Sequence, residues 1–398
     1  MTIEYDPFSP EAMDDPRPLY ARLRADDPVH YVAEYDAWAL ASFEAVWQVC
    51  KDTTNFTCTK GMPPTTALLR EPGGANTFPH LDPPEHRLRR RVLASGYTRE
   101  AAKHDDPVIR AIARSVLDPL LASGDGELDV FRDYASRVAA RVAGYKAGLP
   151  DEDAERVRHL CALGFERAPG QKGTSAENGE AMMQAFGYLH QLVTSARQDP
   201  SQARGDLAAL LAGTIDGRPF TDDEIIGDLF TILITGSETT ETTVAATVYY
   251  LAQYPEQLAQ VRADHSLIPH AFVETVRFDH STDLLCREVV HEIEVCGRTL
   301  KPGQPAMLLW GSVGLDDAEY DRADEFDIHR RPERSLIFGH GQHKCIGEHL
   351  AVRMGTVMLE ELFSAIDAFE VDFDRCHRKN AEFVKGFDSV PIRYEVRH

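Results

Sequence analysis

Residues 338–347 read Phe338-Gly-His-Gly-Gln-His-Lys-Cys345-Ile-Gly347, and this segment is the most informative one in the chain. Three glycines surround Cys345, and they permit tight backbone turns and the close approach of a flat ligand. A helix that begins near Gly347 would point its N–H groups and the positive end of its dipole towards the sulfur, which favours thiolate over thiol. A thiolate held in this way can bind an iron atom axially. The alternative is a structural cysteine in a glycine-rich turn.

The composition restricts the classes of partner. The 398 residues include 42 basic and 64 acidic side chains, a formal charge of −22, which repels phosphate backbones and anionic lipid. The seven cysteines are scattered, odd in number and never spaced as Cys-x-x-Cys, which argues against a disulfide framework, an iron–sulfur cluster or a structural zinc site. The N-terminus lacks the pattern of a signal peptide, and no apolar run approaches about 18 residues. We therefore expect a cytoplasmic protein that binds neither nucleic acid nor membrane.

The hydrophobic pattern predicts one mainly α domain with minor β structure over residues 1–398, because no Pro/Gly-rich linker divides the chain. Strands are expected at 29–32 and 37–40, a helix at 42–50, a long loop at 59–80 and a helix after the Asp82-Pro-Pro-Glu85 segment. Helices dominate to about residue 265, with breaks near 149–151, 168–177 and 198–204. Another helix is expected at 268–279, strands at 285–310, an irregular segment at 311–345, a helix at 347–366 and a β-rich tail.

The longest predicted helix begins at Thr221, where Thr-Asp-Asp-Glu is a capping-box sequence, and continues towards Tyr250. In its middle lies the segment Thr235-Gly-Ser-Glu-Thr-Thr240, whose residues are unfavourable in a helix. One interpretation is a kink formed by the glycine and by hydroxyls that bond to carbonyls. The functional interpretation is that the helix opens here and makes room for a small ligand and a water molecule.

With these motifs in this order, the sequence resembles the cytochrome P450 family from about residue 5 to the C-terminus. The resemblance implies a cytochrome P450 fold, with haem b between the long central helix and the helix that follows the cysteine loop. It also implies that Cys345 binds the iron, with Phe338 and Gly339 part of the haem-binding motif. O2 would be the co-substrate, and electrons would come ultimately from NAD(P)H through a ferredoxin and its reductase to a monomeric bacterial-type enzyme.

Two groups of polar residues resemble elements that hold the haem region together. Glu274 and Arg277, spaced i, i+3, would share a helix face, and a surface ion pair is the alternative. The resemblance implies a buried structural pair, joined by Arg330. His86 and Arg90 also share a face, and a solvated basic helix is the alternative. The resemblance implies a clamp for the haem propionates, completed by the side chains of Arg287 and His343.

The resemblance also points to an acid–alcohol pair in the long helix, Glu238 and Thr239. Activation of dioxygen requires protons in a site otherwise kept dry. A carboxylate at Glu238 can relay protons from solvent, and a hydroxyl at Thr239 can hold an ordered water. These two residues are the catalytic candidates.

The substrate pocket is expected from similarity to the family, although any one of its residues could equally be core packing. Thr235 departs from the family, which usually has Ala or Gly there. Two threonines and Asp283 would make the pocket polar, so we expect a small aromatic or terpenoid substrate with at least one hydrogen-bonding group. The candidate pocket residues are Thr231, Ile234, Thr235, Asp283, Leu284, Leu285, Phe383 and Val384.

These motifs predict a haem-thiolate monooxygenase that performs hydroxylation or oxidative dealkylation. Two alternatives stay open: a peroxide-driven peroxygenase on the same fold, and a non-catalytic haem protein that binds small ligands. Neither alternative requires Glu238 and Thr239.

Overall fold

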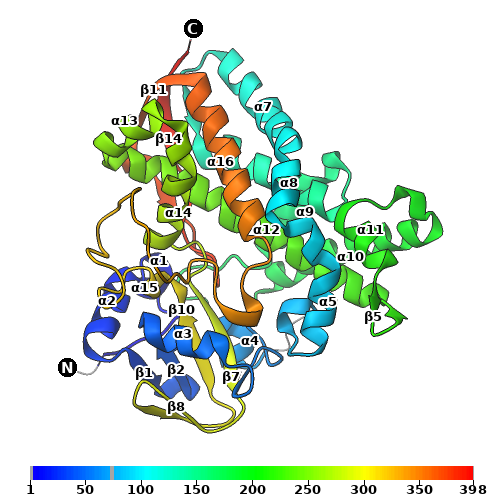
Figure 1. The fold of residues 1–398 in the computed structure, drawn as a ribbon, viewed down its shortest axis with the longest axis vertical. Coiled ribbons are helices and arrows are strands. Elements are labelled where there is room, and N and C mark those ends of the chain that lie inside the picture. The colour runs from blue at the N-terminus through cyan, green and yellow to red at the C-terminus, as the bar shows by residue number, and fades with distance from the viewer. Residues whose placement is uncertain (1–2, 72–75, 398) are drawn as a thin grey trace.

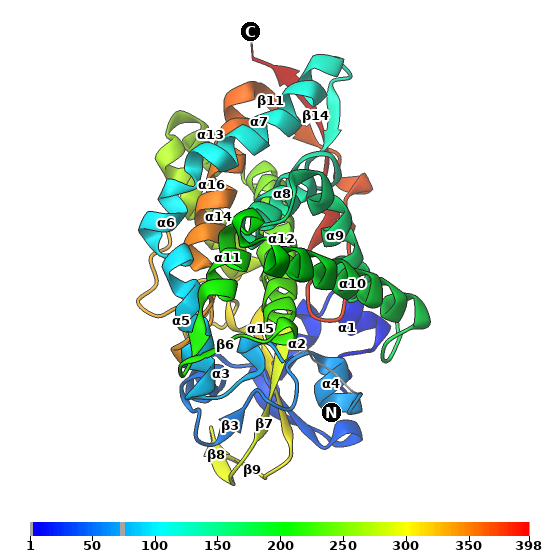
Figure 2. The ribbon, with the colours of Figure 1, turned by 90° about the vertical axis from the view of Figure 1, so that its right-hand side faces the viewer.

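The long helix α12 (Asp222–Gln253) passes through the middle of the molecule in the computed structural model, which describes residues 3–71 and 76–397 (Figure 1). Its start confirms the predicted capping box. The Thr221 hydroxyl accepts the N–H of Glu224 at 3.3 Å, and the Glu224 carboxylate accepts the N–H of Thr221 at 2.9 Å. Figure 2 shows α12 between α14 (Ile268–Phe278) and α16 (Glu348–Ala365) on one side and α9 (Asp151–Leu163) and α10 (Ala176–Gln198) on the other.

Helix α12 is continuous, so the expected opening at residues 235–240 is wrong. The hydroxyls of Thr235 and Thr239 each donate to the carbonyl oxygen four residues earlier, at 2.7 and 3.0 Å. These bonds satisfy the hydroxyls along the helix surface without displacing the backbone N–H groups. The helix therefore tolerates a run of residues with low helix propensity.

The other helices surround α12 and share one large apolar core with it. None of the helices in residues 3–71 and 76–397 has both the length and the apolar character needed to cross a bilayer. The remaining helices are α1 (Pro10–Asp14), α2 (Arg17–Asp26), α3 (Phe43–Lys51), α4 (Pro64–Leu69), α5 (Glu85–Ala94), α6 (Arg99–His104), α7 (Asp106–Ser123), α8 (Ser136–Ala147), α11 (Gly205–Ala212), α13 (Pro255–Ala263) and α15 (Trp310–Val313).

The largest sheet lies at the opposite end of the molecule from α7 and α13 (Figure 1). Its strand order is β1-β2-β10-β7-β3, and only the β2–β10 pair is parallel. Strand β7 follows α14 in the chain and lies between β10 and β3 in the sheet. The strands are β1 (Val29–Val32), β2 (Ala37–Leu40), β3 (Phe56–Thr57), β4 (Glu127–Asp129), β5 (Thr214–Ile215), β6 (Arg218–Pro219), β7 (Leu284–Val289), β8 (Ile293–Val295), β9 (Arg298–Leu300), β10 (Pro305–Leu309), β11 (Ile366–Val371), β12 (His377–Arg378), β13 (Phe387–Ser389) and β14 (Pro391–Val396).

The long loop expected at 59–80 contains a helix, α4, so this part of the prediction is wrong. Pro64 occupies the first turn, where its missing N–H costs no hydrogen bond, and the helix ends at Leu69 before Arg70 adopts a left-handed conformation. Residues 72–75 of the expected loop lie outside the described residues.

A buried ion pair fixes α5 against α12. The Arg89 guanidinium contacts the Asp228 carboxylate at 2.6 Å, and both side chains are fully buried. The N–H of Phe78 also donates to Asp228, at 2.7 Å. Arg89 is therefore the one member of the basic 86–91 run whose charge is neutralised within the core, and it sets the position of its neighbours on α5.

We expect Asp228→Ala to lower the free energy of unfolding by about 3–5 kcal/mol, because it leaves a buried guanidinium unpaired. Glu155→Ala is the matched control, since the Arg137–Glu155 pair is about half exposed on both sides and should contribute no more than about 1 kcal/mol. Denaturant unfolding of the two variants measures the difference. Equal losses would show that the buried pair does not fix α5.

Candidate active site

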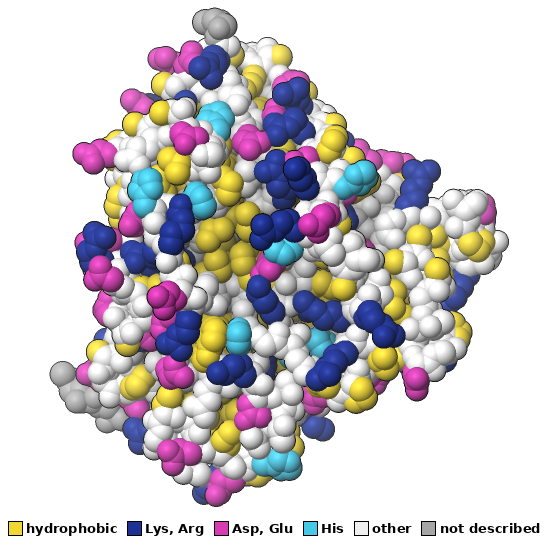
Figure 3. All heavy atoms as spheres, viewed as in Figure 1, with side chains coloured by type: hydrophobic (Ala, Val, Ile, Leu, Met, Phe, Trp, Pro, Cys, Tyr) yellow, Lys and Arg dark blue, Asp and Glu magenta, His cyan; other side chains and the backbone are white. Residues whose placement is uncertain are grey.

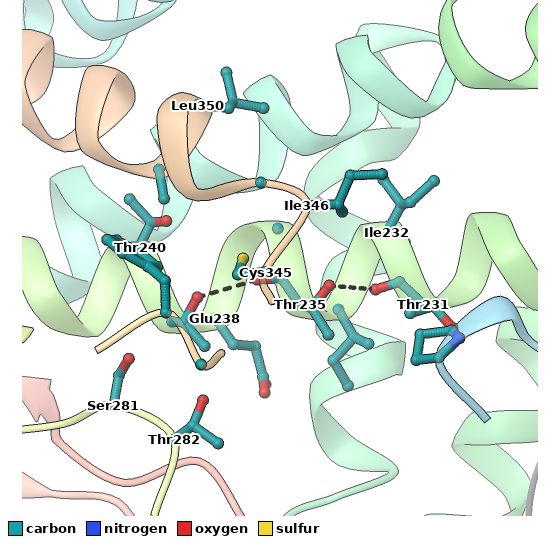
Figure 4. A pocket seen from close by; sticks show the side chains of 18 of the residues that line it. Thr231, Ile232, Thr235, Glu238, Thr240, Ser281, Thr282, Cys345, Ile346 and Leu350 are labelled. Carbon is teal, nitrogen blue, oxygen red and sulfur yellow. Dashed lines mark hydrogen bonds between the residues drawn. The ribbon is translucent and has the colours of Figure 1, made fainter. Parts of the chain in front are cut away.

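A cavity lies between α12 and the cysteine loop at the start of α16, and Figure 4 shows side chains that line it. Most of its surface is apolar. The lining residues come from seven places in the chain: the 62–97 region, α8, α12, residues 272–285, Trp310, residues 337–354 and the turn at 383–384. The cavity thus gathers most of the motifs that the sequence singled out.

Cys345 belongs to this cavity. Its side chain is exposed within the cavity that it lines. Its N–H donates to the Phe338 carbonyl at 2.8 Å, which closes the loop. Gly339 and Gly341 both have positive φ, and a Cβ at Gly341 would lie 2.6 Å from the Cys50 carbonyl oxygen. The glycines are therefore required to bring the loop over the cavity.

The charge state of the Cys345 sulfur depends on two opposing effects. Burial raises the pKa of its thiol, whereas the N–H of Gly347 and the positive charge of Arg90 act to lower it. Burial is the larger effect, but the Gly347 N–H acts in the expected direction, towards the thiolate. The donors reduce the cost of charge on the sulfur, and a bound cation would have to supply the rest.

The four expected clamp residues lie near one another, and three of them line the cavity: His86, Arg90 and His343. The rings of His86 and His343 are 4.3 Å apart. Arg287 does not line the cavity and donates to the Val49 carbonyl at 2.9 Å, but its charge contributes to the pKa of both histidines.

This cluster has an excess of positive charge. Burial, with Arg90 adding to it, lowers the pKa of His86 to about 4, and burial with Arg287 lowers the pKa of His343 to about 3. Both ring nitrogens of His86 are buried without a hydrogen-bond partner among the described residues. Donors without acceptors around a cavity fit a bound dianion, as two carboxylates of a cofactor would provide.

Trp310 is a further polar group of the cavity that the sequence analysis missed. It is 9% exposed, it lines the cavity, and its Nε1–H has no partner among the described residues. A Cβ at Gly339 would lie 3.9 Å from its ring, so it stands beside the cysteine loop. A buried indole donor left open beside the cysteine loop can bind an acceptor group of a ligand in the cavity. The sequence carries no motif around Trp310 that would have indicated this role.

One face of α12 forms the opposite wall of the cavity. Thr235 is exposed and Thr231 and Thr239 are half-buried, in a helix that is otherwise almost entirely buried. They are spaced four residues apart, so all three lie on the cavity side, as Figure 4 shows for Thr231 and Thr235.

Glu238, adjacent to Thr239, is only 3% exposed. Its Oε1 lies 3.8 Å from Nζ of Lys379, and its Oε2 has no partner among the described residues. One turn further, the fully buried Glu241 pairs with Arg158 of α9. Burial raises the pKa of Glu241 although Arg158 opposes the effect. The sequence analysis missed Lys379 and Arg158, because their approach to Glu238 depends on the tertiary fold. It also did not select Glu241, which lies three residues after Glu238 on α12.

Glu274, Arg277 and Arg330 come together at the C-terminal half of α14. Glu274 and Arg277 are buried and form two charge-assisted hydrogen bonds of 2.6 and 2.9 Å. Arg330 approaches Glu274 at 3.4 Å. The remaining donors of Arg277 bind backbone carbonyls of Gly314, Ala323 and Glu325, so the pair organises the irregular 311–345 segment.

The structure corrects two of the expected substrate-pocket residues. Asp283 does not line the cavity; its carboxylate accepts the Tyr20 hydroxyl at 3.0 Å, because a carboxylate turned into an apolar cavity would lose that compensation. Leu284 faces away because side chains alternate along β7, whereas Leu285 lines the cavity. Ser281 and Thr282, which the sequence analysis did not select, do line it. The other expected residues on the cavity wall are Thr231, Ile234, Thr235, Leu285, Phe383 and Val384.

Comparison with known proteins gives consistent results. Residues 173–387 match the family model described as Cytochrome P450. Cytochrome P450 123 of Mycobacterium tuberculosis is 32% identical over 98% of this chain and 97% of its own length. Cytochrome P450 CYP199A2 of Rhodopseudomonas palustris is 29% identical over 98% and 93%. The crystal structure of CalO2 superposes with a TM-score of 0.86 at 26% identity, covering 99% of both chains.

The low pKa of His86 makes stability depend on pH in the cofactor-free protein. Between pH 7 and pH 5 the unfolded chain takes up a proton on this ring, with an ordinary pKa near 6.5, and the folded protein, with a pKa of about 4, does not. The free energy of unfolding therefore falls as the pH drops. His86→Gln should reduce that fall by about 1–2 kcal/mol, whereas the exposed His291→Gln should not. Denaturant unfolding at pH 7 and pH 5 measures the free energy of unfolding of each variant. If the decrease between these pH values were the same in His86→Gln as in the wild type, burial of His86 would not be its cause.

Proposed function

This chain belongs to the cytochrome P450 family and is a haem monooxygenase of the bacterial type, and from that premise we propose that it inserts one oxygen atom of O2 into a small organic substrate. The reaction would be hydroxylation or oxidative dealkylation, with two electrons from separate redox partners. Members of the family carry haem b, use O2 as co-substrate and take electrons derived from NAD(P)H. When bound, the haem supplies the centre at which dioxygen is activated, aided by electron density from an axial thiolate.

We propose that Cys345 is the axial ligand and that the donors around it hold the propionates. Cys345 is the cysteine that lines the cavity, and the Phe338–Gly339 turn brings it there. His86, Arg90 and His343 would donate to the propionates, and Arg287 would add positive charge nearby. The unpartnered nitrogens of His86 support this assignment, since a buried donor is costly until an acceptor is present.

The observation that carries the monooxygenase assignment is the arrangement of Glu238 and Thr239 on α12. The Thr239 hydroxyl gives its hydrogen to the Thr235 carbonyl, so its oxygen can accept a hydrogen bond from water in the cavity. Glu238 has one oxygen near Lys379 and one oxygen free, and a carboxylate with a free oxygen can take up a proton and release it at the cavity. A peroxide-driven enzyme or a haem protein that only binds ligands would not need this pair.

We propose that a ferredoxin, reduced by its reductase, docks on the face that carries the cysteine loop. Figure 3 shows dark blue side chains gathered on this face, over the elements α5, α7 and α16, in a protein whose net charge is −22. Arg87, Arg91 and Lys344 are exposed there. Such a local basic patch would attract an acidic electron donor and orient it towards Cys345.

The monooxygenase assignment predicts a thiolate spectrum and coupled turnover. The reduced protein with carbon monoxide should show the red-shifted Soret band of thiolate ligation, and Cys345→Ala should lose it. Thr239→Val should keep that band but form on the order of tenfold less product per NADH consumed with redox partners and substrate, whereas Thr239→Ser should stay close to the wild type. A wild-type protein without the band, or Thr239→Val with unchanged coupling, would contradict the assignment.

Trp310 provides a separate test of the cofactor site. Trp310→Phe removes the open indole donor but keeps the ring, so haem should transfer to apomyoglobin several-fold faster. Trp38→Phe is the matched control, because that indole donates to Gln304 at 2.8 Å and does not line the cavity. Equal transfer rates in the two variants would show that Trp310 does not bind the haem.

A further inference from the structure

Five threonines recur at every fourth position of α12, and each hydroxyl donates to the carbonyl oxygen four residues earlier. Four of them, Thr231, Thr235, Thr239 and Thr243, line the cavity described above. A carbonyl oxygen can only accept, so the direction of every one of these hydrogen bonds is fixed. The bonds run from Thr231 to Gly227 (3.0 Å), Thr235 to Thr231 (2.7 Å), Thr239 to Thr235 (3.0 Å), Thr243 to Thr239 (2.6 Å) and Thr247 to Thr243 (2.8 Å).

This arrangement makes the α12 wall an acceptor surface. A hydroxyl has one hydrogen and two lone pairs, and here the hydrogen is already used within the helix. Thr235 is the most exposed of the series, so its oxygen can offer lone pairs to a molecule in the cavity. A ligand that presents another acceptor here, such as a carbonyl or an ether oxygen, could not form a hydrogen bond to Thr235, and the two oxygen atoms would repel each other.

The wall of the cavity opposite α12 also carries hydroxyl groups, but their hydrogen-bond direction is not fixed. Ser281 and Thr282 line the cavity across from α12 (Figure 4), and their hydroxyls have no hydrogen-bond partner within the described part of the chain. Such hydroxyls can rotate and act as donor or acceptor. They therefore do not select between ligands, whereas the hydroxyls of Thr231, Thr235 and Thr239, whose hydrogens are already donated within α12, do.

The part of the cavity proposed to hold the substrate, around Thr235, Leu285 and Phe383, has, among the described residues, no uncompensated charge that would attract an ion. Burial lowers the pKa of His280 to about 4, and its ring is satisfied by the Ile337 carbonyl and the Thr282 N–H. Glu238 is held by Lys379. The neighbouring side chains, Ile234, Leu285, Phe383 and Val384, are apolar. This environment favours a neutral molecule with an apolar body.

We propose that the substrate is a neutral, largely apolar molecule that donates a hydrogen bond from an O–H or N–H group to Thr235, with Thr231 as the neighbouring acceptor. A phenol or an N–H heteroaromatic ring has this chemistry. The inference rests on the proposed function, because it places the substrate in the cavity beside the haem. It narrows the substrate from one with a hydrogen-bonding group to one with a donor.

Matched ligand pairs test the proposal in the haem-loaded enzyme. The probes are 4-ethylphenol, 4-tert-butylphenol and 3-methylindole, each with its O-methyl or N-methyl counterpart, and the readout is the Soret shift on binding. We expect each donor to bind about five- to tenfold more tightly than its methylated counterpart, the difference expected of one hydrogen bond. Thr235→Val keeps the β-branched shape but removes the oxygen, so it should abolish the preference, and Thr235→Ser should retain it.

The outcomes separate this proposal from the proposed function. If no donor binds more tightly than its methylated counterpart, including the case of no shift at all, or if Thr235→Val keeps the preference, the inference is overturned. The carbon monoxide spectrum, measured in parallel, confirms that each variant holds its haem through Cys345. A preference that is lost in Thr235→Val supports the acceptor wall even if no product forms with redox partners, and that second result would count against the monooxygenase assignment alone.

Discussion

The cost of burying charge beside an apolar cavity governs the arrangement of this protein. Where a charge has no role at the cavity, an opposite charge compensates it, as Asp228 does for Arg89 and Glu274 for Arg277. At the cavity itself, His86 and His343 stand with Arg90, and none of the three forms an ion pair with a carboxylate of the described residues. The same helix, α5, carries both the compensated Arg89 and the uncompensated His86, so the core ion pair holds the open donors in place.

Cys345 and Glu238, the two reactive groups proposed for the cavity, both carry the cost of a buried charge. Their surroundings reduce this cost in different ways. The Cys345 sulfur is surrounded by donors that only partly offset its burial, which suits a group that is to share its charge with a metal. Glu238 keeps one oxygen near Lys379 and one oxygen free, which suits a group that exchanges protons. On the cavity wall near these two groups, α12 presents threonine oxygens while its backbone remains a continuous helix.

The sequence predicted local structure correctly where the interacting residues are close together in the chain. The capping box at Thr221, the glycines around Cys345 and the i, i+3 spacing of Glu274 and Arg277 all lead to the observed local structure. Contacts between distant segments could not be predicted in this way. Asp283 was placed in the pocket because Tyr20, its partner 263 residues away, leaves no trace in the local sequence. Lys379 and Trp310 were missed for the same reason, and helix α4 because a short proline-started helix resembles a loop in sequence.

The Tyr20–Asp283 hydrogen bond also gives the first residues of the chain an influence on the cavity wall. Ile3, Tyr5 and Phe8 are buried, the Tyr5 and Tyr20 rings are 6.1 Å apart, and the N–H of Asp283 donates to the Phe383 carbonyl at 2.7 Å. The N-terminal segment thus supports the turn that carries Phe383 and Val384, through the contacts of Tyr20 and Asp283. Versions of the protein shortened at this end for crystallisation or for fusion to an electron donor would consequently lose packing behind the cavity wall at Phe383 and Val384.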